Sequence, residues 1–137
     1  MKQFNDIKIH NNVYYDYINS KFDYNNTLSK NYLNIDIPTI IVPTMHYCYS
    51  HSIMDFIFPL YWIINDIKNN TDYTNFNLFI RTPPHSENYS IISNKQKKYI
   101  KVWNELINLL DFKNIYFQHL TDTNLYFKIF IEIDYEG

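Results

Sequence analysis

The clearest pattern along the chain is a short β-branched run followed by a long apolar segment. Residues 39–42, TIIV, are all β-branched and end at Pro43. A continuous apolar run of this length indicates a strand covered on both faces. After a polar loop, apolar side chains recur at helical spacing over residues 51–68. This spacing predicts a helix that packs on a sheet and is also covered from outside, with a kink at Pro59.

The patterns before this segment are weaker. Residues 4–18 alternate irregularly between apolar and polar side chains, which indicates one or two short strands at a sheet edge. Residues 19–34 are rich in turn formers, so we expect a loop there. Residues 35–42 form the first convincing strand, which Pro38 divides into an alternating half and a continuous half.

Four more elements follow the long helix. FNLFIR, residues 76–81, reads as a strand that stops before two prolines. A second helix is expected from Ser93 or Asn94 to Leu110, with an apolar stripe on one side and lysines in its first half. Residues 114–117 and the alternating segment 126–133, YFKIFIEI, then predict two strands.

The order strand, helix, strand, helix, strand favours an α/β fold. We therefore expect residues 1–137 to form a single Rossmann-like layered domain, with a mainly parallel sheet flanked by helices and right-handed crossovers. A chain of this length buries roughly two thirds of the surface that its unfolded form exposes, so a metal or a disulfide is not needed for stability.

Charge and composition exclude several classes of protein. The formal net charge of -2 gives no basic field, so a nucleic-acid partner is not expected. The first residues lack the apolar core of a signal peptide, and the longest apolar stretch is too short to span a bilayer, which favours a cytoplasmic protein. The only glycine, Gly137, rules out a P-loop or a dinucleotide-binding fingerprint. The bias towards Asn, Ile, Lys and Tyr is typical of an AT-rich genome.

Most of the candidate chemistry lies between the first long strand and its helix. His51 and Asp55 are spaced i, i+4, so the carboxylate could orient the imidazole as a general base. Spacing alone favours the simpler alternative, in which Asp55 interacts with the positive end of the helix and His51 is packed. The neighbouring residues His46, Ser50 and Ser52 are candidate ligand-binding residues, because the free amides at a helix start can bind a phosphate or a sugar hydroxyl.

Three other side chains have structural interpretations that outweigh functional ones. Cys48, the only cysteine, is expected to be a small buried side chain and not a nucleophile. Trp62 and Trp103 could stack on a base or a sugar, but each lies on a strongly apolar helix and is expected in the core.

The segment YCYSHSIMDFIFPLYWIIND resembles the N-terminal half of glycosyltransferase family 61, whose members carry a histidine-led motif of the form H-x-x-x-D-x-x-x-P/L after the first core strand. The resemblance continues through FNLFIR, NELINLLDF, KNIYFQHL and LYFKIFIEI, and covers about residues 36–134. It implies a GT-B type enzyme with two Rossmann-like halves and a nucleotide-sugar donor held mainly by the C-terminal half. His51 and Asp55 match the motif and would lie on the acceptor side of the cleft.

The resemblance implies a role for this chain as an acceptor-side half. The sequence ends at Gly137, where the donor-binding half would begin, so we expect a glycosyltransferase-like domain that is split from its partner or inactive alone. No cofactor or metal site is indicated. A second protein half or another copy of the chain is the expected partner, because an unpaired half leaves apolar surface exposed, and a glycan is the expected acceptor. The alternatives are a non-catalytic interaction module, or a small nucleotide- or cap-binding protein that uses Trp62 and Trp103.

Overall fold

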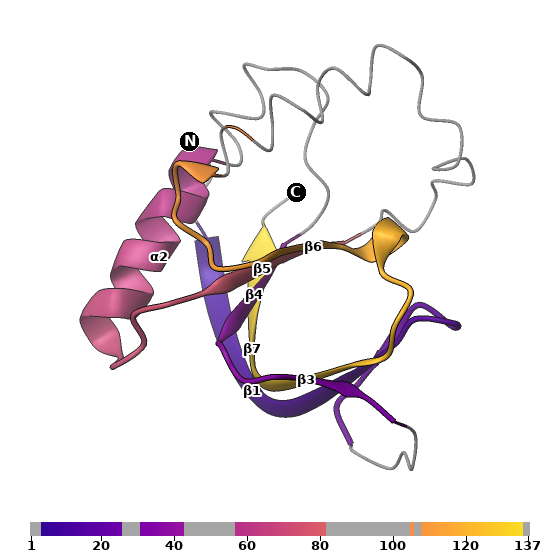
Figure 1. The fold of residues 1–137 in the computed structure, drawn as a ribbon. Helices are drawn as coiled ribbons and strands as arrows, with labels where there is room; N and C mark the ends of the chain where they lie inside the picture. The colour runs from indigo at the N-terminus through magenta and orange to yellow at the C-terminus, as the bar shows by residue number, and fades with distance from the viewer. Residues whose placement is uncertain (1–3, 26–30, 43–56, 82–104, 106–107, 136–137) are drawn as a thin grey trace.

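The computed structural model describes residues 4–25, 31–42, 57–81, 105 and 108–135 (Figure 1). They contain one seven-stranded sheet of order β2-β1-β7-β4-β5-β6, and β3 also pairs with β7. In Figure 1, α2 lies on one side of this sheet, and the strands curl on the other side. The elements are β1 (Phe4–Asp16), β2 (Lys21–Asp23), β3 (Leu33–Ile35), β4 (Thr39–Val42), α2 (Phe58–Asn70), β5 (Asn77–Ile80), β6 (Ile115–Phe117), the 3₁₀ turn η2 (Gln118–Leu120) and β7 (Leu125–Tyr135).

The strands β4 and β5 form the centre of the sheet and are buried on both faces. They pair in parallel, and all eight of their residues are buried. Ile40 and Leu78 pack towards α2, whereas Ile41 and Phe79 pack into a second core on the opposite face. The predicted strands at 39–42 and 76–81 are confirmed, and so is the expectation that the first is covered on both sides.

The helix α2 covers one face of the central strands with four aliphatic side chains at helical spacing, namely Leu60, Ile63, Ile64 and Ile67. Its outer side was expected to be covered as well, and this is wrong for the described residues. Phe58, Tyr61 and Trp62 are 47%, 53% and 51% exposed, so Trp62 is not a core residue. Pro59 lies in the first turn of α2 as its bounds are described, and residues 51–56, over which the predicted helix would begin, lie outside the described part of the chain, so the expected kink stays a prediction.

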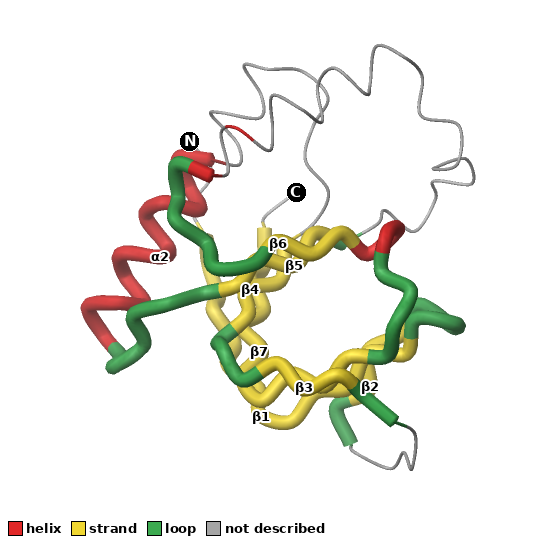
Figure 2. Tube along the Cα trace, viewed as in Figure 1, coloured by secondary structure: helices red, strands yellow, loops and turns green. Residues whose placement is uncertain are grey.

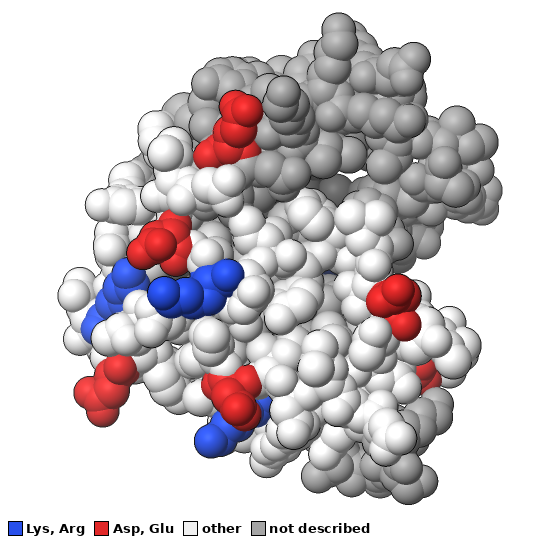
Figure 3. Space-filling model, viewed as in Figure 1, with Lys and Arg blue, Asp and Glu red and all other residues white. Residues whose placement is uncertain are grey.

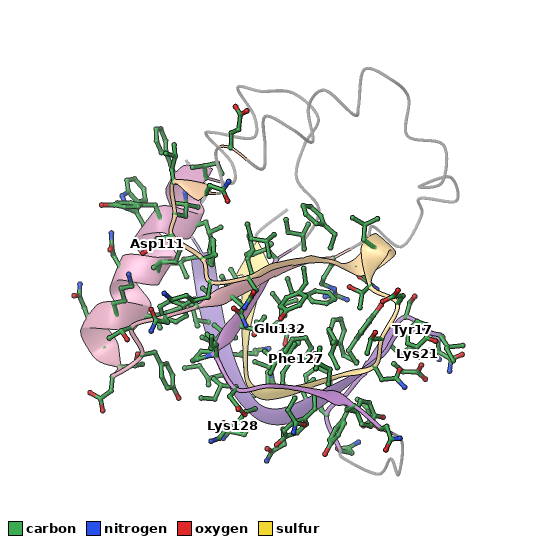
Figure 4. All side chains as sticks on the ribbon, viewed as in Figure 1. Tyr17, Lys21, Asp111, Phe127, Lys128 and Glu132 are labelled. Carbon is green, nitrogen blue, oxygen red and sulfur yellow. The ribbon has the colours of Figure 1, made fainter. Side chains whose placement is uncertain are left out.

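The two longest strands, β1 and β7, pair antiparallel along most of their length. Near Asn12, the odd-numbered side chains of both strands change from one face of the sheet to the other. Ile129 and Ile131 pack in the core beneath α2. Phe127 is also odd-numbered, but it packs in the second core together with the even-numbered Phe130. Asn12 has a positive φ of 59°, which asparagine tolerates better than most residues, and the pairing skips from Asn11 to Val13. Figure 4 shows Phe127 on the inner side of the curl and Lys128 on its outer side.

The segment from β3 to β4 runs along one side of β7 with one extra residue. Ile35 pairs with Phe127 and Thr39 with Phe130, so four steps along this segment oppose three steps along β7 (39 − 35 = 4; 130 − 127 = 3). Pro38 lies in this bulge, where its missing N–H leaves no ladder bond unmade. The sequence-based strand at 35–42 is therefore two strands, divided at Pro38 as expected.

The change of face near Asn12 and the bulge together bend the sheet into an open half-barrel (Figure 2). Inside the curl lies the second core, which is dominated by aromatic rings. Its largest fully buried members are Tyr15, Phe79, Phe127 and Phe130. Their rings meet mostly edge to face, at centroid distances of 5.4 Å for Tyr15–Phe79 and 5.5 Å for Phe127–Phe130, the arrangement that aromatic quadrupoles favour.

The predicted fold class is wrong. β1 was expected at a sheet edge, but it lies between β2 and β7 and brings antiparallel pairing into the sheet, which is therefore mixed. A Rossmann-like or GT-B half would have helices on both faces of a mainly parallel sheet. In the described part of the chain, α2 covers one face, and the curl of the sheet itself encloses the other. The predicted strands at 114–117 and 126–133 correspond to β6 and β7.

Candidate active site at the rim of the curled sheet

The residues singled out from sequence fall in a part of the chain that is not described. His46, Cys48, Ser50, His51, Ser52 and Asp55 all lie in residues 43–56, and Trp103 lies in residues 82–104. The pairing of His51 with Asp55 therefore stays a prediction. What the structure does place is the strand before them, β4, whose carboxyl end at Val42 leads into this segment.

A histidine and a carboxylate meet close to this carboxyl end. His10 of β1 and Glu132 of β7 lie on neighbouring strands, and Nε2 of the imidazole is 3.1 Å from Oε2 of the carboxylate. Both side chains are about one third exposed, so the pair is partly shielded from water but accessible. Glu132 is also opposite Ile41 in the register between β7 and β4, which places the pair beside the last residues of β4.

The ring of Tyr24 packs against His10. The two ring centroids are 4.9 Å apart in an edge-to-face arrangement, and both rings contact Phe130. Burial raises the pKa of the Tyr24 hydroxyl, the negative charge of Glu132 raises it further, and the positive charge of Arg81 partly opposes them. This phenol therefore stays protonated at neutral pH and can donate a hydrogen bond beside the histidine and the carboxylate.

Arg81 supplies the positive charge of the cluster. It follows β5 directly, and its backbone N–H donates to the carbonyl of Val42, which ties the carboxyl ends of β4 and β5 together. Its guanidinium carbon lies 5.7 Å from the ring centroid of Phe22, within the range of a cation–π contact. We call His10, Tyr24, Arg81 and Glu132 the rim cluster.

The rim cluster rests on the aromatic core. Phe22 contacts Phe130 at a centroid distance of 5.1 Å and Phe79 at 5.5 Å, and Phe130 also contacts the rings of His10 and Tyr24. Packed rings of this kind have few alternative positions, so they hold the polar groups above them in place. The carboxyl ends of parallel strands are also where open α/β sheets bind their ligands.

The cluster combines groups that can move a proton with groups that can hold a polar ligand. An imidazole that donates Nε2–H to a carboxylate keeps Nδ1 as its basic nitrogen, which is the arrangement of an oriented general base. Tyr24 and Arg81 add hydrogen-bond donors, and the partly buried ring of Phe22 adds apolar area. Across the described residues there is no group of three or more His, Cys, Asp or Glu side chains that could hold a metal ion.

Sequence reasoning missed the rim cluster because its members are far apart in the chain. His10 and Glu132 are separated by 122 residues, and each lies in a strand whose alternation explains a polar residue as a solvated side chain. Only the pairing of β1 with β7 brings them together. One signal was present: Glu132 lies between two isoleucines of β7.

A cavity lies beside β6 and η2, and no residue of the rim cluster lines it. Its volume is about 270 Å³, and its walls are mostly apolar and include Leu33, Tyr116, Phe117, Leu120 and Leu125. Burial raises the pKa of Tyr116, so this hydroxyl also stays protonated. The lining residues whose side chains the structure describes include no histidine, lysine or arginine.

The surface and the comparisons add little to these observations. On the face shown in Figure 3, acidic and basic side chains lie in small mixed groups, without a wide basic area. No helix in the described part of the chain is both long and apolar enough to cross a membrane. Comparisons of the chain with protein-family models, with curated proteins and with solved structures each found no match.

Proposed function

We propose that this chain is a glycosyltransferase-like domain that binds the acceptor of a sugar-transfer reaction at the rim cluster. The observation that carries the proposal is the contact between His10 and Glu132 beside Tyr24 and Arg81. The resemblance of residues 36–134 to glycosyltransferase family 61 suggests the reaction class, although the GT-B fold that it implied is not the fold of this chain. The donor would be a nucleotide sugar held by a second protein half.

In the proposed reaction, His10 acts as the base for the acceptor hydroxyl. Nδ1 takes the hydroxyl proton, and the oxygen forms a bond to the anomeric carbon of the donor sugar. The bond from that carbon to the nucleoside diphosphate breaks, and its electron pair leaves with the phosphate oxygen. Glu132 stabilises the imidazolium that forms, as an acidic partner does for a catalytic histidine.

Tyr24 and Arg81 would bind and orient the acceptor in this scheme. A sugar offers hydroxyl groups on its edge and C–H groups on its face, so it fits a site with hydrogen-bond donors around aromatic rings. The protonated phenol of Tyr24 donates to one hydroxyl oxygen, and the guanidinium of Arg81 donates to another. Placing an acceptor in this way lowers the entropic part of the barrier.

Binding of the acceptor can be tested without a donor half. The isotope-labelled chain is titrated with short neutral saccharides, and we expect the ring signals of His10 and Tyr24 to shift, with weaker binding in His10→Ala and Glu132→Gln. Lys68→Ala, at an exposed position in the last turn of α2, is the matched control and should bind like the wild type. Saccharides that saturate the protein without moving either ring would contradict the proposal.

A sugar-transfer assay needs the donor half, and it distinguishes His10 from His51 as the general base. If a neighbouring reading frame encodes that half, the two proteins are mixed and sugar transfer is measured. His10→Ala should lower the rate by on the order of 10²–10⁴-fold, the usual contribution of a general base. A loss of that size in His51→Ala, with His10→Ala unaffected, would transfer the role to the predicted pair of His51 and Asp55.

The second candidate role is a protein-interaction module. The observation that favours it is the outer side of α2, where Phe58, Tyr61 and Trp62 are each about half exposed. Exposed aromatic side chains that lie together often mark a contact surface, here for a second half or another copy of the chain. Sedimentation equilibrium tests it: Trp62→Ser should weaken association, and a strict monomer at high concentration would count against it.

A further inference from the structure

The outer face of the curled sheet carries an ordered row of polar and aromatic side chains. In the register of the strands, Asp23 of β2 lies opposite Tyr14 of β1, Tyr14 opposite Tyr126 of β7, and Tyr126 opposite Asn34 of β3. Each strand thus contributes one side chain at the same level. At about 4.8 Å between strands, the three steps from β2 to β3 span about 14 Å, the length of a short oligosaccharide.

These side chains point away from the aromatic core. Their neighbours along the strands, Phe22, Tyr15, Phe127 and Ile35, pack inside the curl, and successive side chains of a strand alternate between faces. The ring contact between Tyr14 and Tyr126, with centroids 4.9 Å apart, confirms that both lie on one face. The ring of Tyr32, just before β3, joins them at 4.6 Å from Tyr14.

The polar groups on this face suit hydroxyl-bearing ligands. The hydroxyl of Tyr126 donates to Oδ1 of Asn12, which holds the phenol in a defined direction. The hydroxyl of Tyr32 is shielded from water and has no hydrogen-bond partner among the described residues. Its pKa is raised by burial and, to a lesser degree, by Asp16 and Asp23, so it stays protonated, and Tyr32 offers its ring to a ligand on this face.

The charge of this face favours a neutral glycan over a nucleic acid as its ligand. Across this face, the two carboxylates Asp16 and Asp23 are matched by the two cations Lys21 and Lys128, so the face carries no net positive charge (2 − 2 = 0). A phosphate backbone needs a positive surface and is therefore disfavoured. Neither arginine nor tryptophan contributes to the row, although these two side chains, together with tyrosine, most often anchor protein partners. Aromatic rings between amide and carboxylate groups are what a neutral sugar chain requires.

We propose that Tyr14, Tyr32 and Tyr126 form a binding surface for a soluble, neutral oligosaccharide, which we call the tyrosine face. The rings of Tyr32 and Tyr126 are inclined to that of Tyr14 by 65° and 42°, so the surface is stepped and not flat. A stepped surface fits a twisted single chain and does not fit an ordered polysaccharide crystal. This proposal goes beyond the proposed function: the tyrosine face lies on the other side of the sheet from the rim cluster, and the binding it describes needs no transfer reaction.

The test uses the whole chain and defined probes. The labelled protein is titrated with malto-, cello- and chito-hexasaccharides, with crystalline cellulose and with single-stranded RNA. We expect at least one soluble hexasaccharide to shift the ring signals of Tyr14, Tyr32 and Tyr126, and neither cellulose nor RNA to bind. Tyr32→Ala should weaken hexasaccharide binding about tenfold. Tyr61→Ala removes a more exposed tyrosine, on α2, and should leave the affinity unchanged.

Two further variants keep the test decisive. Tyr126→Phe retains the ring and should weaken binding less than Tyr32→Ala, and circular dichroism of each variant shows whether it is folded. His10→Ala should leave hexasaccharide binding at the tyrosine face intact while it abolishes transfer, so the two proposals fail separately. The proposal is overturned if no hexasaccharide shifts the tyrosine rings, if folded Tyr32→Ala binds like the wild type, or if the face binds RNA or a second copy of the chain.

Discussion

The central strands and the curled strands solve different packing problems. In β4 and β5 every residue is buried, because α2 covers one face and the aromatic core covers the other. In β1 and β7 one face at a time is covered, and the covered face changes near Asn12 and Lys128. The central strands therefore have no room for polar side chains beyond Thr39 and Asn77.

The difference shows where function can be placed in such a sheet. A strand with a solvated face can present polar groups at no cost in buried charge. β1 and β7 do this twice: His10 and Glu132 lie at the rim, and Tyr14 and Tyr126 lie on the outer face. The central strands form the buried centre of the sheet, and the curled strands carry the candidate functional side chains.

The largest expected effect comes from removing a ring of the aromatic core. Phe127→Ala should destabilise the protein by about 3–5 kcal/mol, since it leaves a cavity among rings that have little room to rearrange. Denaturant unfolding measures the change, with Tyr61→Ala on the outside of α2 expected within about 0.5 kcal/mol of the wild type. Equal losses in the two variants would mean that the curl is not built around this core.

A smaller effect on stability is expected at Asn12, where the covered face of β1 changes. Asn12→Ile places a β-branched side chain at a positive φ and should cost about 1–3 kcal/mol more than Asn12→Gly, which accepts that backbone conformation. Both variants lose the hydrogen bond from Tyr126, so the comparison isolates the backbone. Thermal unfolding of the pair is the measurement. An isoleucine variant as stable as the glycine variant would show that the strand does not need this conformation to bend.

Two substitutions should shift the pKa of Tyr24 in opposite directions. Glu132→Gln should lower the pKa, because it removes a charge that raises it, whereas Arg81→Gln should raise the pKa further. NMR of tyrosine labelled in the ring follows both. Shifts of the same sign would mean that these charges do not act on Tyr24 as the structure places them.

The same shift carries a pH dependence of stability. The folded protein holds the phenol proton of Tyr24 more tightly than the unfolded chain does. Stability should therefore be unaffected below the ordinary tyrosine pKa of 10.0 and fall as the pH rises above it. Tyr32 and Tyr116, whose pKa values are also raised, act in the same direction. Unfolding free energies measured across this range would contradict the account if they rose with pH.

Local patterns predicted the helix-covered half well and the curled half poorly. The runs TIIV and FNLFIR could only be buried strands, and β4 and β5 are such strands. Residues 4–18 gave no sign of a partner, because antiparallel pairing with a strand more than 100 residues away leaves no local trace. A change of face also weakens the alternation that identifies a strand, which is why β1 read as short edge strands.

The candidate site was beyond local reasoning for the same reason. A histidine and an aspartate four residues apart suggested a pair at once, and residues 43–56, where they lie, are not described. The pair that the structure does show, His10 with Glu132, exists only through tertiary pairing. Trp62 was assigned to the core because hydrophobicity shows that a helix is apolar all round and does not show which side the sheet covers.

Nitrogen NMR of the His10 ring tests the central claim most directly. At a pH where the ring is neutral, the account predicts that Nε2 carries the proton, because it donates to Glu132, and that Nδ1 is the basic nitrogen. Addition of a saccharide acceptor should then move the Nδ1 signal, with no such response in Glu132→Leu. A ring protonated at Nδ1, or an Nδ1 signal that ignores every saccharide while the protein binds them, would contradict the account.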